Sequence, residues 1–534
     1  MTRQLFSTSI PLLLTFAVAG AQEAVYTWYG EPGLPSDSFG ESVSGAGDVN
    51  GDGFADVIVG RPGFTMAEVF SGRDGSVLYT LYGAGGIFGS SVSGAGDVNK
   101  DGFADVIVGA PWYSGPSFAQ VFSGRTGGMI YSFSSYADGF GISVSGAGDV
   151  NKDGFADVIV GASTNSERGT NYGKAIVYSG STGAVLHSFY GDGYWALFGW
   201  SVSSAGDVNR DGYADVIVGA PNHDFDHGRV RVFSGKSGAV LYSFDGGAAA
   251  RLGHSVSNAR DVNKDGYADF IIGGHVPGNY IVHVDVRSGR DGSVLFSFTG
   301  PNGSSFPSVS DCGDVDGDSY PDVIVGVNTS ECYDYVGCVG RATVLSGLDG
   351  SVLFSVSGDR YEDRFATSVS GAGDMNGDGL AEFVVGAPWY WGGSSNAGYV
   401  RTFTGRQCDA SWNNYGQGWP GTFSVPELTL SGDPVLGTTV NLFVGNSRAK
   451  STIANLMIGL SEAYLPTNLD GVLLVVPIQL FPLAVPAVGL NIPVSIPNDG
   501  SFCGTSFYLQ AIEYDPGASL DYSFTPGLKM ILGD

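Results

Sequence analysis

Basic residues are scarce in this chain of 534 residues, where 25 lysines and arginines face 53 aspartates and glutamates and leave a formal net charge of −28. A surface of this sign repels phosphate backbones, which argues against nucleic-acid binding. Only six histidines are present, and no catalytic triad is recognisable around them. An apolar fraction of 43% argues against a disordered acidic chain.

Cysteine is also rare, and no Cys-x-x-Cys pair occurs, so a zinc or thiol redox site has no support. An odd number of cysteines leaves at least one thiol unpaired or intermolecular, and the pairing among them stays open. The five are Cys312, Cys332, Cys338, Cys408 and Cys503.

The apolar stretch at the N-terminus is too short to cross a bilayer. Residues 1–21 combine Arg3, an apolar segment over residues 10–18 and the small residues Ala19-Gly20-Ala21. This pattern predicts a secretory signal peptide that is cleaved before Gln22. We therefore expect a secreted protein, extracellular or on the cell surface, with no membrane span after signal removal.

Glycine, by contrast, is abundant at 85 residues, and an acidic stretch recurs seven times at intervals of 49 to 60 residues. A typical copy is "DVNKDGFAD" over residues 97–105. An alternating segment such as "SVSGAGDV" precedes each copy, and an apolar run such as "DVIVG" follows it. A third segment like "AQVFSG" and, in six of the units, a turn like "GRDG" and a fourth segment like "SVLYTLYG" complete the unit. Four strands per unit and seven units predict a seven-bladed β-propeller.

The seventh unit stops at "FTGRQC" and has no fourth strand. Before the first unit stands "AVYTWYGE" (residues 24–31), which matches "VLYTLYGA" (residues 77–84). We expect residues 24–31 to supply the missing outer strand and close the ring, which hides an edge that could recruit other chains. An open solenoid with an atypical cap is the alternative. The predicted propeller covers residues 22–408.

Each acidic stretch has the residue types of a calcium loop. Counting Asp97 as position one, carboxylate or amide oxygens stand at positions one, three, five and nine, and the carbonyl of position seven can complete the shell. Position twelve of an EF-hand would be Val108 here, so the site is a strand–loop–strand loop closed by position nine. The alternative is an acidic hairpin turn whose side chains bond only to backbone. Up to seven structural Ca²⁺ ions are predicted.

The predicted metal ligands are Asp48, Asn50, Asp52, Phe54, Asp56, Asp97, Asn99, Asp101, Phe103, Asp105, Asp149, Asn151, Asp153, Phe155, Asp157, Asp207, Asn209, Asp211, Tyr213, Asp215, Asp261, Asn263, Asp265, Tyr267, Asp269, Asp314, Asp316, Asp318, Tyr320, Asp322, Asp374, Asn376, Asp378, Leu380 and Glu382. The sixth loop departs from the pattern at Ser319 and Pro321, and the seventh closes with Glu382. The first five loops are therefore the better matched.

The units resemble FG-GAP repeats, which build the N-terminal propeller of integrin alpha subunits. The naming residues are Phe88-Gly89 ahead of Gly109-Ala110-Pro111, and Phe198-Gly199 ahead of Gly219-Ala220-Pro221. The resemblance implies the propeller fold, calcium binding and ligand recognition on the face opposite the calcium loops. It does not by itself imply integrin function.

Aromatic residues gather in the loops expected on that opposite face. They suit sugar stacking or a protein hot spot, although the alternative is that they pack over neighbouring loops. Six of them are predicted to bind ligand: Trp112, Tyr113, Trp195, Trp389, Tyr390 and Trp391. Tyr194 lies next to Trp195 in the sequence.

Beyond the repeats, residues 409–422 read as a linker and residues 423–534 as a C-terminal β-sandwich. Residues 472–490 are apolar, but Pro477, Pro482 and Pro486 would break a membrane helix, so core strands are preferred.

We interpret the protein as a recognition or adhesion module for an extracellular protein or glycan. The alternatives are an extracellular enzyme acting on polysaccharide and a purely structural surface protein. "HDFDH" (residues 223–227) matches no known metal motif, and no catalytic residue is assigned.

Overall fold

A computed structural model describes residues 12–13, 24–31, 37–83, 85–112, 114–136, 138–277, 281–300, 306–328, 339–360, 363–388, 398–405, 411–435, 438–469, 471–477, 479–496 and 506–532. The chain divides into two compact units. One comprises Gln22–Gly405, and the other comprises Met1–Ala21 with Arg406–Asp534.

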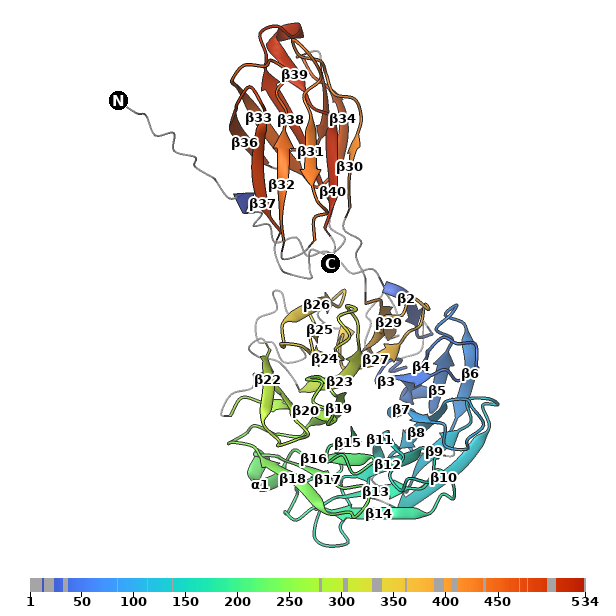
Figure 1. Cartoon of the computed structure of the whole chain (residues 1–534). Helices are drawn as coiled ribbons and strands as arrows, with labels where there is room; N and C mark the ends of the chain where they lie inside the picture. The colour runs from blue at the N-terminus through green and yellow to red at the C-terminus, as the bar shows by residue number, and fades with distance from the viewer. Residues whose placement is uncertain are drawn as a thin grey trace. The chain divides into compact units, whose positions relative to one another are not determined.

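The first unit consists of seven four-stranded antiparallel sheets arranged in a ring (Figure 1). The sheets are β3 (Val43–Gly47), β4 (Asp56–Arg61), β5 (Met66–Phe70), β6 (Val77–Tyr82); β7 (Ser91–Gly96), β8 (Asp105–Ala110), β9 (Pro116–Phe122), β10 (Met129–Tyr136); β11 (Phe140–Gly148), β12 (Asp157–Ala162), β13 (Lys174–Tyr178), β14 (Val185–Tyr190); β15 (Ser201–Gly206), β16 (Asp215–Ala220), β17 (Arg229–Phe233), β18 (Val240–Asp245); β19 (Ser255–Arg260), β20 (Asp269–His275), β21 (Val282–Arg287), β22 (Val294–Thr299); β23 (Pro307–Gly313), β24 (Asp322–Val327), β25 (Arg341–Leu345), β26 (Val352–Ser357); and β27 (Ser368–Gly373), β28 (Glu382–Ala387), β29 (Tyr399–Phe403), β2 (Ala24–Tyr29).

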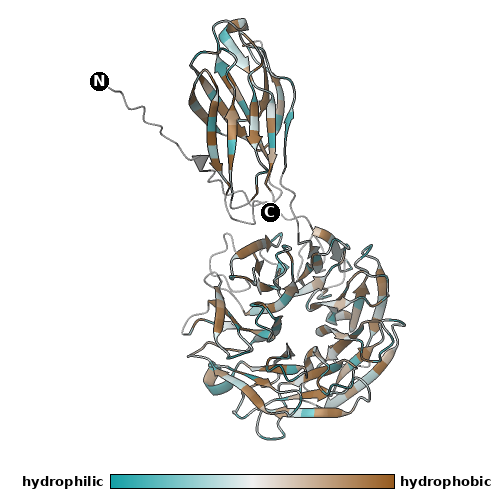
Figure 2. Ribbon diagram, viewed as in Figure 1, coloured by the Kyte–Doolittle hydropathy of each residue, from teal (hydrophilic) through white to brown (hydrophobic). Residues whose placement is uncertain are grey.

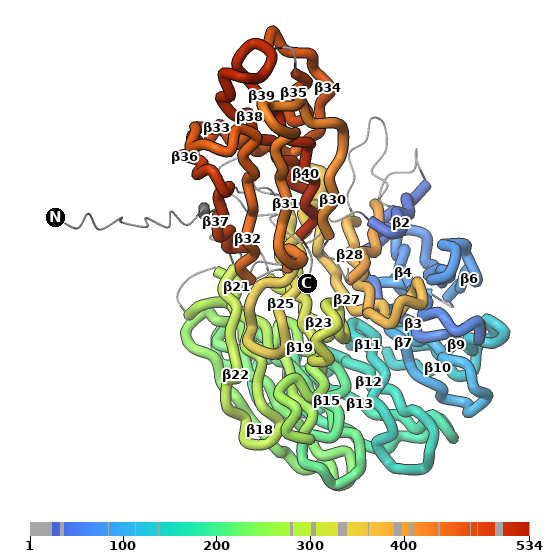
Figure 3. The backbone as a smooth tube through the Cα atoms, turned by 45° about the horizontal axis from the view of Figure 1, so that its top comes forward, coloured from blue at the N-terminus to red at the C-terminus, as the bar shows by residue number. Residues whose placement is uncertain are grey.

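The first strand of each sheet contacts the first strand of the next, and β27 contacts β3, which closes the ring (Figure 3). A serine at the start of this strand marks every junction. Its Oγ accepts a hydrogen bond from a valine N–H of the neighbouring sheet, as from Val256 to Ser201 at 2.9 Å. The same bond joins Val43 to Ser368 at 3.0 Å, where the last sheet meets the first. The prediction of a seven-bladed propeller is confirmed.

The junction serines permit a test of how much these bonds stabilise the ring. Ser201→Ala leaves the buried N–H of Val256 without its acceptor, so we expect a loss of about 1–3 kcal/mol in the free energy of unfolding. Urea unfolding followed by fluorescence measures it. Ser203→Ala is the matched control on β15, because the hydroxyl of Ser203 makes no hydrogen bond within the described part of the chain. Equal losses in both variants would contradict the assignment.

The outer strand of the last sheet comes from the opposite end of the sequence. β2 pairs antiparallel with β29, with Trp28 opposite Val400. It also contacts the first sheet, because the indole N–H of Trp28 donates to the carbonyl of Gly75 at 2.8 Å and its ring lies 4.7 Å from that of Phe70. β2 thus ties the last sheet to the first.

The apolar runs predicted as strands form the second strand of each sheet. All six residues of β4, β8, β12, β16, β24 and β28 are buried, because these strands are covered on both faces by neighbouring sheets. Figure 2 shows the hydrophobic residues along the strands. Glycine is required where the backbones meet: a Cβ on Gly60 would lie 2.0 Å from the carbonyl oxygen of Gly89.

The second unit is a sandwich of two sheets. One contains β37 (Leu490–Ser495), β32 (Thr439–Val444) and β31 (Leu428–Ser431), with the two-residue β1 (Leu12–Leu13) beside β37. The other contains β30 (Ser411–Tyr415), β40 (Gly527–Ile531), β38 (Ser506–Tyr514), β33 (Thr452–Gly459) and β36 (Gln479–Val485), with β39 (Tyr522–Phe524) paired to β38. A small hairpin joins β34 (Glu462–Pro466) to β35 (Val472–Val475). The predicted C-terminal sandwich is confirmed.

The second unit contains one strand more than the sequence predicts. Residues 411–415 were expected in a linker but form β30, an edge strand that pairs with β40 along its whole length. The apolar segment 472–490 contains β35 and β36, as preferred over a membrane helix. In the described ranges, no helix has the length and apolar character needed to cross a bilayer.

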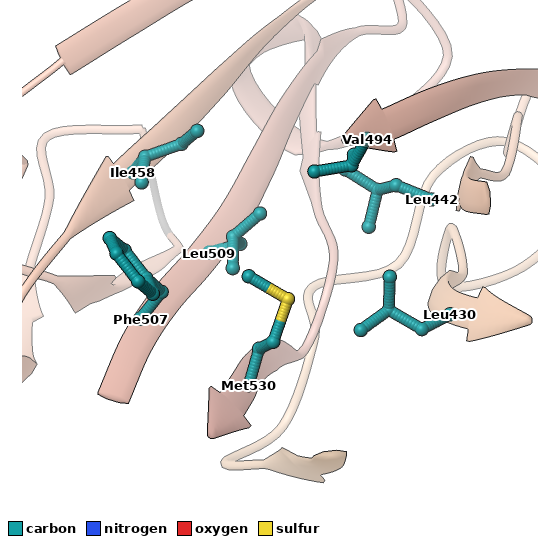
Figure 4. Close-up of a pocket in the computed structure, with 7 residues that line it drawn as sticks. All are labelled: Leu430, Leu442, Ile458, Val494, Phe507, Leu509 and Met530. Atoms are coloured by element: carbon teal, nitrogen blue, oxygen red, sulfur yellow. The ribbon is translucent and has the colours of Figure 1, made fainter. Parts of the chain in front are cut away.

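The interior of the sandwich is apolar and closely packed. Figure 4 shows side chains from both sheets pointing into it, around a void of only about 10 Å³. This apolar void is too small for an organic ligand, so its lining side chains serve to pack the two sheets together. Its lining residues are Leu430, Leu442, Ile458, Val494, Phe507, Leu509 and Met530.

Several sequence predictions fall outside the described residues. They are the signal peptide, apart from Leu12–Leu13, and the four cysteines Cys332, Cys338, Cys408 and Cys503. Cys312 is described: it is a free, buried cysteine on β23.

Candidate cation loops and recognition hollow

The acidic loops connect the first and second strands of all seven sheets. In the second loop, Asp97 Oδ2 accepts from the N–H of Gly102 at 2.9 Å, and Asn99 Oδ1 accepts from the N–H of Asp101 at 2.9 Å. Asp101 Oδ1 accepts from the N–H of Phe103 at 3.1 Å. The seven loops share these three bonds. The side chains at positions one, three and five therefore fix the curved backbone of the loop through hydrogen bonds to its own amides. These are the bonds of the hairpin alternative, and they leave further lone pairs on each carboxylate.

The acidic residue at position nine is buried in every loop and begins the second strand. Asp105 Oδ2 accepts from the N–H of Val98 in the loop, and Oδ1 accepts from the N–H of Gly124 at the end of the third strand, both at 2.9 Å. Position nine therefore joins the acidic loop to the turn between the third and fourth strands. The sequence motif indicated the acid but not this second attachment.

Burial raises the pKa of the position-nine carboxyls above their ordinary values. The pKa rises to about 6 for Asp56, Asp105 and Asp157, to about 7 for Asp215, Asp269 and Glu382, and to about 8 for Asp322. Two other acids of the same loop add to the effect, those at positions one and five in most loops and at positions three and five in the sixth, although backbone N–H donors oppose it. No described lysine, arginine or histidine forms an ion pair with these carboxylates, and a cation in the loop would supply the positive charge.

Neighbouring loops are joined to one another around the ring. The N–H of Ala104 at position eight donates to the carbonyl of Asp48 at position one of the preceding loop, at 3.1 Å. Five other loops repeat this bond; in the sixth, Pro321 has no N–H to donate. Where position four is basic, its side chain stacks on the aromatic ring at position seven of the next loop, as Lys152 does on Tyr213 at 5.3 Å. Sequence spacing alone did not indicate these links, since they cross between units.

The donor set of the loops suits a hard cation. In the sixth loop, one carboxylate oxygen each from Asp314, Asp316 and Asp322 lies within 4.8 Å of the others, a separation that one ion can bridge. This loop was expected to match less well because of Ser319 and Pro321. Ser319 adopts the left-handed conformation of the glycine that it replaces, with φ of 70°, so the loop keeps its course.

The predicted ligand-binding aromatics separate into described and undescribed groups. Tyr113, Trp389, Tyr390 and Trp391 lie outside the described residues. Trp112 follows β8, is exposed, and donates its indole N–H to Ser114 Oγ at 2.8 Å. Trp195 lies in the crossing from β14 to β15 with its ring 6.3 Å from that of Tyr194. No described contact links Trp112 to this pair.

A hollow of about 510 Å³ lies where that crossing meets the loop from β16 to β17. Its aromatic members are Tyr194, Trp195 and Phe225, which are 69%, 49% and 95% exposed. Polar groups from Asn222, His223, Asp224 and Asp226 complete its lining. Phe225 carries no charge or motif signal, so sequence reasoning missed it.

The backbone that presents Phe225 is strained. The four-residue turn α1 (His223–Asp226) contains three successive residues in the left-handed region, with φ of 50° at Asp224, 56° at Phe225 and 67° at Asp226. Each such residue costs roughly 1–2 kcal/mol relative to the right-handed form. Strain of this kind clusters at binding sites, and here it projects an aromatic ring into solvent.

Charges around the hollow are mostly paired. Asp226 accepts from Arg251 at 3.2 Å, and Asp192 pairs with Arg229 at 3.0 Å and also with Arg231. Burial lowers the pKa of His223, which keeps its ring neutral at physiological pH. In a chain with a net charge of −28, this region is close to neutral.

The class of the protein follows from the ring of seven sheets and from comparison with known families. The FG-GAP repeat model matches residues 39–79, 88–131, 140–185, 198–241 and 365–403, which are the first four sheets and the seventh. The propeller is thus built at least in part from FG-GAP repeats, five of which the model matches. The fifth and sixth sheets lie outside the matched segments, and there Leu252 replaces the phenylalanine and Pro307 the glycine of the naming pair.

Within that class the chain is similar to integrin alpha subunits. It is 33% identical to integrin alpha-4 of Xenopus laevis over 146 residues, which cover 25% of this chain and 14% of that protein. It is 32% identical to integrin alpha-PS5 of Drosophila melanogaster over 184 residues, covering 30% and 18%. The matched segments therefore span less than a fifth of these curated relatives.

One solved structure, BBS1N in complex with ARL6DN, aligns with 72% of this chain and 98% of its own, at 11% identity and a TM-score of 0.44. This score is too low to support a functional comparison.

Proposed function

We propose that the protein is an extracellular recognition module whose propeller binds a ligand at the aromatic hollow and is stabilised by calcium in its acidic loops. The observation that carries this proposal is the hollow itself, where a strained turn holds Phe225 almost fully exposed beside Trp195. A folded protein gains nothing for its own stability from this arrangement. The similarity to integrin alpha subunits supports a non-catalytic, extracellular role.

Calcium would be held by the oxygens at positions one, three, five and nine together with the carbonyl at position seven. When bound, the ion neutralises the acids of its loop and stabilises the folded state by mass action. The protein's own contribution is to shape the loop before the ion arrives, through the amide bonds to positions one, three and five. No step of recognition is assigned to the ion.

For the ligand of the hollow we propose a neutral saccharide. Flat aromatic faces pack against sugar rings, while the amide of Asn222 and the carboxylate of Asp224 suit sugar hydroxyls. A cationic ligand would need several unpaired acids, but Asp226 and Asp192 are already paired with arginines. That leaves Asp224, 3.6 Å from Nδ1 of His227, as the one acid of the described lining without an arginine partner. The volume of about 510 Å³ suits one or two sugar rings.

The experiment is a glycan array with the mature protein in calcium, followed by titration of the best glycan into variants. We expect Trp195→Ala and Phe225→Ala each to weaken binding at least about tenfold, since each removes a stacking face worth about 1.4 kcal/mol or more. Tyr82→Ala is the control, because Tyr82 is 68% exposed on β6 and belongs to another sheet.

Binding that survives both variants would place the ligand elsewhere on the propeller. An array without any hit, together with capture of an extracellular protein that Phe225→Ala abolishes, would keep the recognition role and replace the saccharide with a protein ligand. Hydrolysis of the bound glycan would favour the polysaccharide enzyme instead. Nothing in the described hollow favours that alternative, since Asp226 is held by Arg251 and His223 is neutral.

A further inference from the structure

A second acidic site lies inside the C-terminal sandwich, apart from the propeller loops. Glu513 is 1% exposed and Asp515 is fully buried. Glu513 continues the inward face of β38 after Leu509 and Ala511, both of which belong to the apolar core. A carboxylate in such a position costs several kcal/mol unless its charge is compensated.

The two carboxylates share one serine. Ser447 Oγ lies 2.7 Å from Glu513 Oε2 and 3.0 Å from Asp515 Oδ2. Glu513 Oε2 also accepts from the N–H of Ser447 at 2.9 Å and from Ser523 Oγ at 3.1 Å. Asp515 accepts from the N–H of Thr422 at 2.6 Å and from its hydroxyl at 2.5 Å. A fourth donor to Asp515 is the N–H of Gly517 at 3.0 Å.

These donors do not satisfy the cluster. The Ser447 hydroxyl carries one hydrogen, so it can donate to only one of the two carboxylates at a time. Glu513 Oε1 is buried and has no hydrogen-bond partner among the described residues. Within the described ranges, no lysine, arginine or histidine forms an ion pair with Glu513 or Asp515.

Thr422 donates two hydrogen bonds to Asp515, and these bonds hold the pKa of its carboxyl below the ordinary value although burial raises it.

We propose that Glu513 and Asp515 bind a hard divalent cation of the calcium class in the C-terminal unit. The side chains that meet here, those of Glu513, Asp515 and Ser447, offer carboxylate and hydroxyl oxygens, the donors that calcium prefers, and Glu513 Oε1 is the oxygen left available for it. The ion would join three segments that are distant in sequence: the loop at Ser447, the strands carrying Glu513 and Ser523, and the loop at Thr422.

The test uses the full mature chain, wild type and Glu513→Gln, dialysed against micromolar calcium and washed. Bound calcium per chain is counted by elemental analysis. We expect the variant to hold one ion fewer than the wild type. Glu427→Gln is the matched control, because Glu427 is exposed in the same unit, and it should hold the wild-type number.

Hydrogen exchange resolved by peptide on the wild-type chain gives an independent reading that needs no variant. Calcium should slow exchange at the N–H groups around Ser447 and on β38 and β39, and magnesium should do so less. Equal calcium content in wild type and variant, or exchange in this unit that calcium leaves unchanged, would overturn the proposal. A Glu513→Gln variant that is more stable than the wild type with and without calcium would indicate a shared proton instead.

Discussion

Removing calcium at pH 7.5 is expected to lower the melting temperature of the propeller by many degrees, and by much less at pH 5. Seven buried position-nine carboxyls have their pKa raised by burial, to values between about 6 and about 8. Without a cation they are mostly charged at pH 7.5, next to the other acids of their loops. At pH 5 most of them are protonated, so repulsion between the carboxylates of a loop destabilises the metal-free propeller less.

The direction of the pH dependence follows from linkage. Because these acids have a higher pKa folded than unfolded, the folded state binds more protons between roughly pH 4 and 8, and metal-free stability falls as the pH rises through that window. Calcium competes with the same protons, so its affinity rises with pH. Differential scanning calorimetry should therefore give opposite slopes of melting temperature against pH in chelator and in calcium.

One loop can be separated from the others by substitution. Asp215→Asn removes a titrating group whose pKa burial raises to about 7, so the metal-free slope should shrink by up to about 1.4 kcal/mol per pH unit near pH 6. The exposed Asp433→Asn should leave the slope unchanged. Identical melting curves with and without chelator at pH 7.5 would contradict calcium binding by the loops.

Loss of β2 is expected to open the ring. A chain that begins after residue 31 leaves the outer edge of β29 unpaired and removes the Trp28 contacts to Phe70 and Gly75. The exposed edge should recruit other chains, so we expect oligomers by size-exclusion chromatography and a lower unfolding temperature. Fast hydrogen exchange should appear in β29 first.

Adding the peptide "AVYTWYGE" in excess should restore the monomer and the slow exchange of β29. A scrambled peptide of the same composition is the control. Trp28→Ala in the full chain should give a smaller loss, because the backbone pairing with β29 remains while the side-chain contacts to the first sheet are lost. A truncated chain that stays monomeric with unchanged melting would show that β2 does not close the ring.

Much of the fold could be predicted because the chain repeats one unit seven times. Period-two alternation marks the strands, and "DVIVG" marks the buried second strand, since only a strand covered on both faces is apolar throughout. The last unit lacks a fourth strand, and residues 24–31 form a spare segment that matches one. This predicted that the spare segment completes the last sheet, and β2 does pair with β29. The prediction of a linker was wrong for residues 411–415, because the Trp, Asn and Tyr residues of this edge strand have the composition of a polar linker.

The sequence by itself determined which residues repeat, and so the number of sheets, the acidic loops and the serine at each junction. It could not show that position nine also binds the amide at the end of the third strand, or that Phe225 stands beside Trp195. Those relations join residues on different strands or in different units, and no local pattern records a distance in space. The Glu513–Asp515 cluster is another such relation. Alternation on β38 places a glutamate on the inward face. Only folding brings Ser447 and Thr422 to the cluster and leaves one carboxylate oxygen without a described partner.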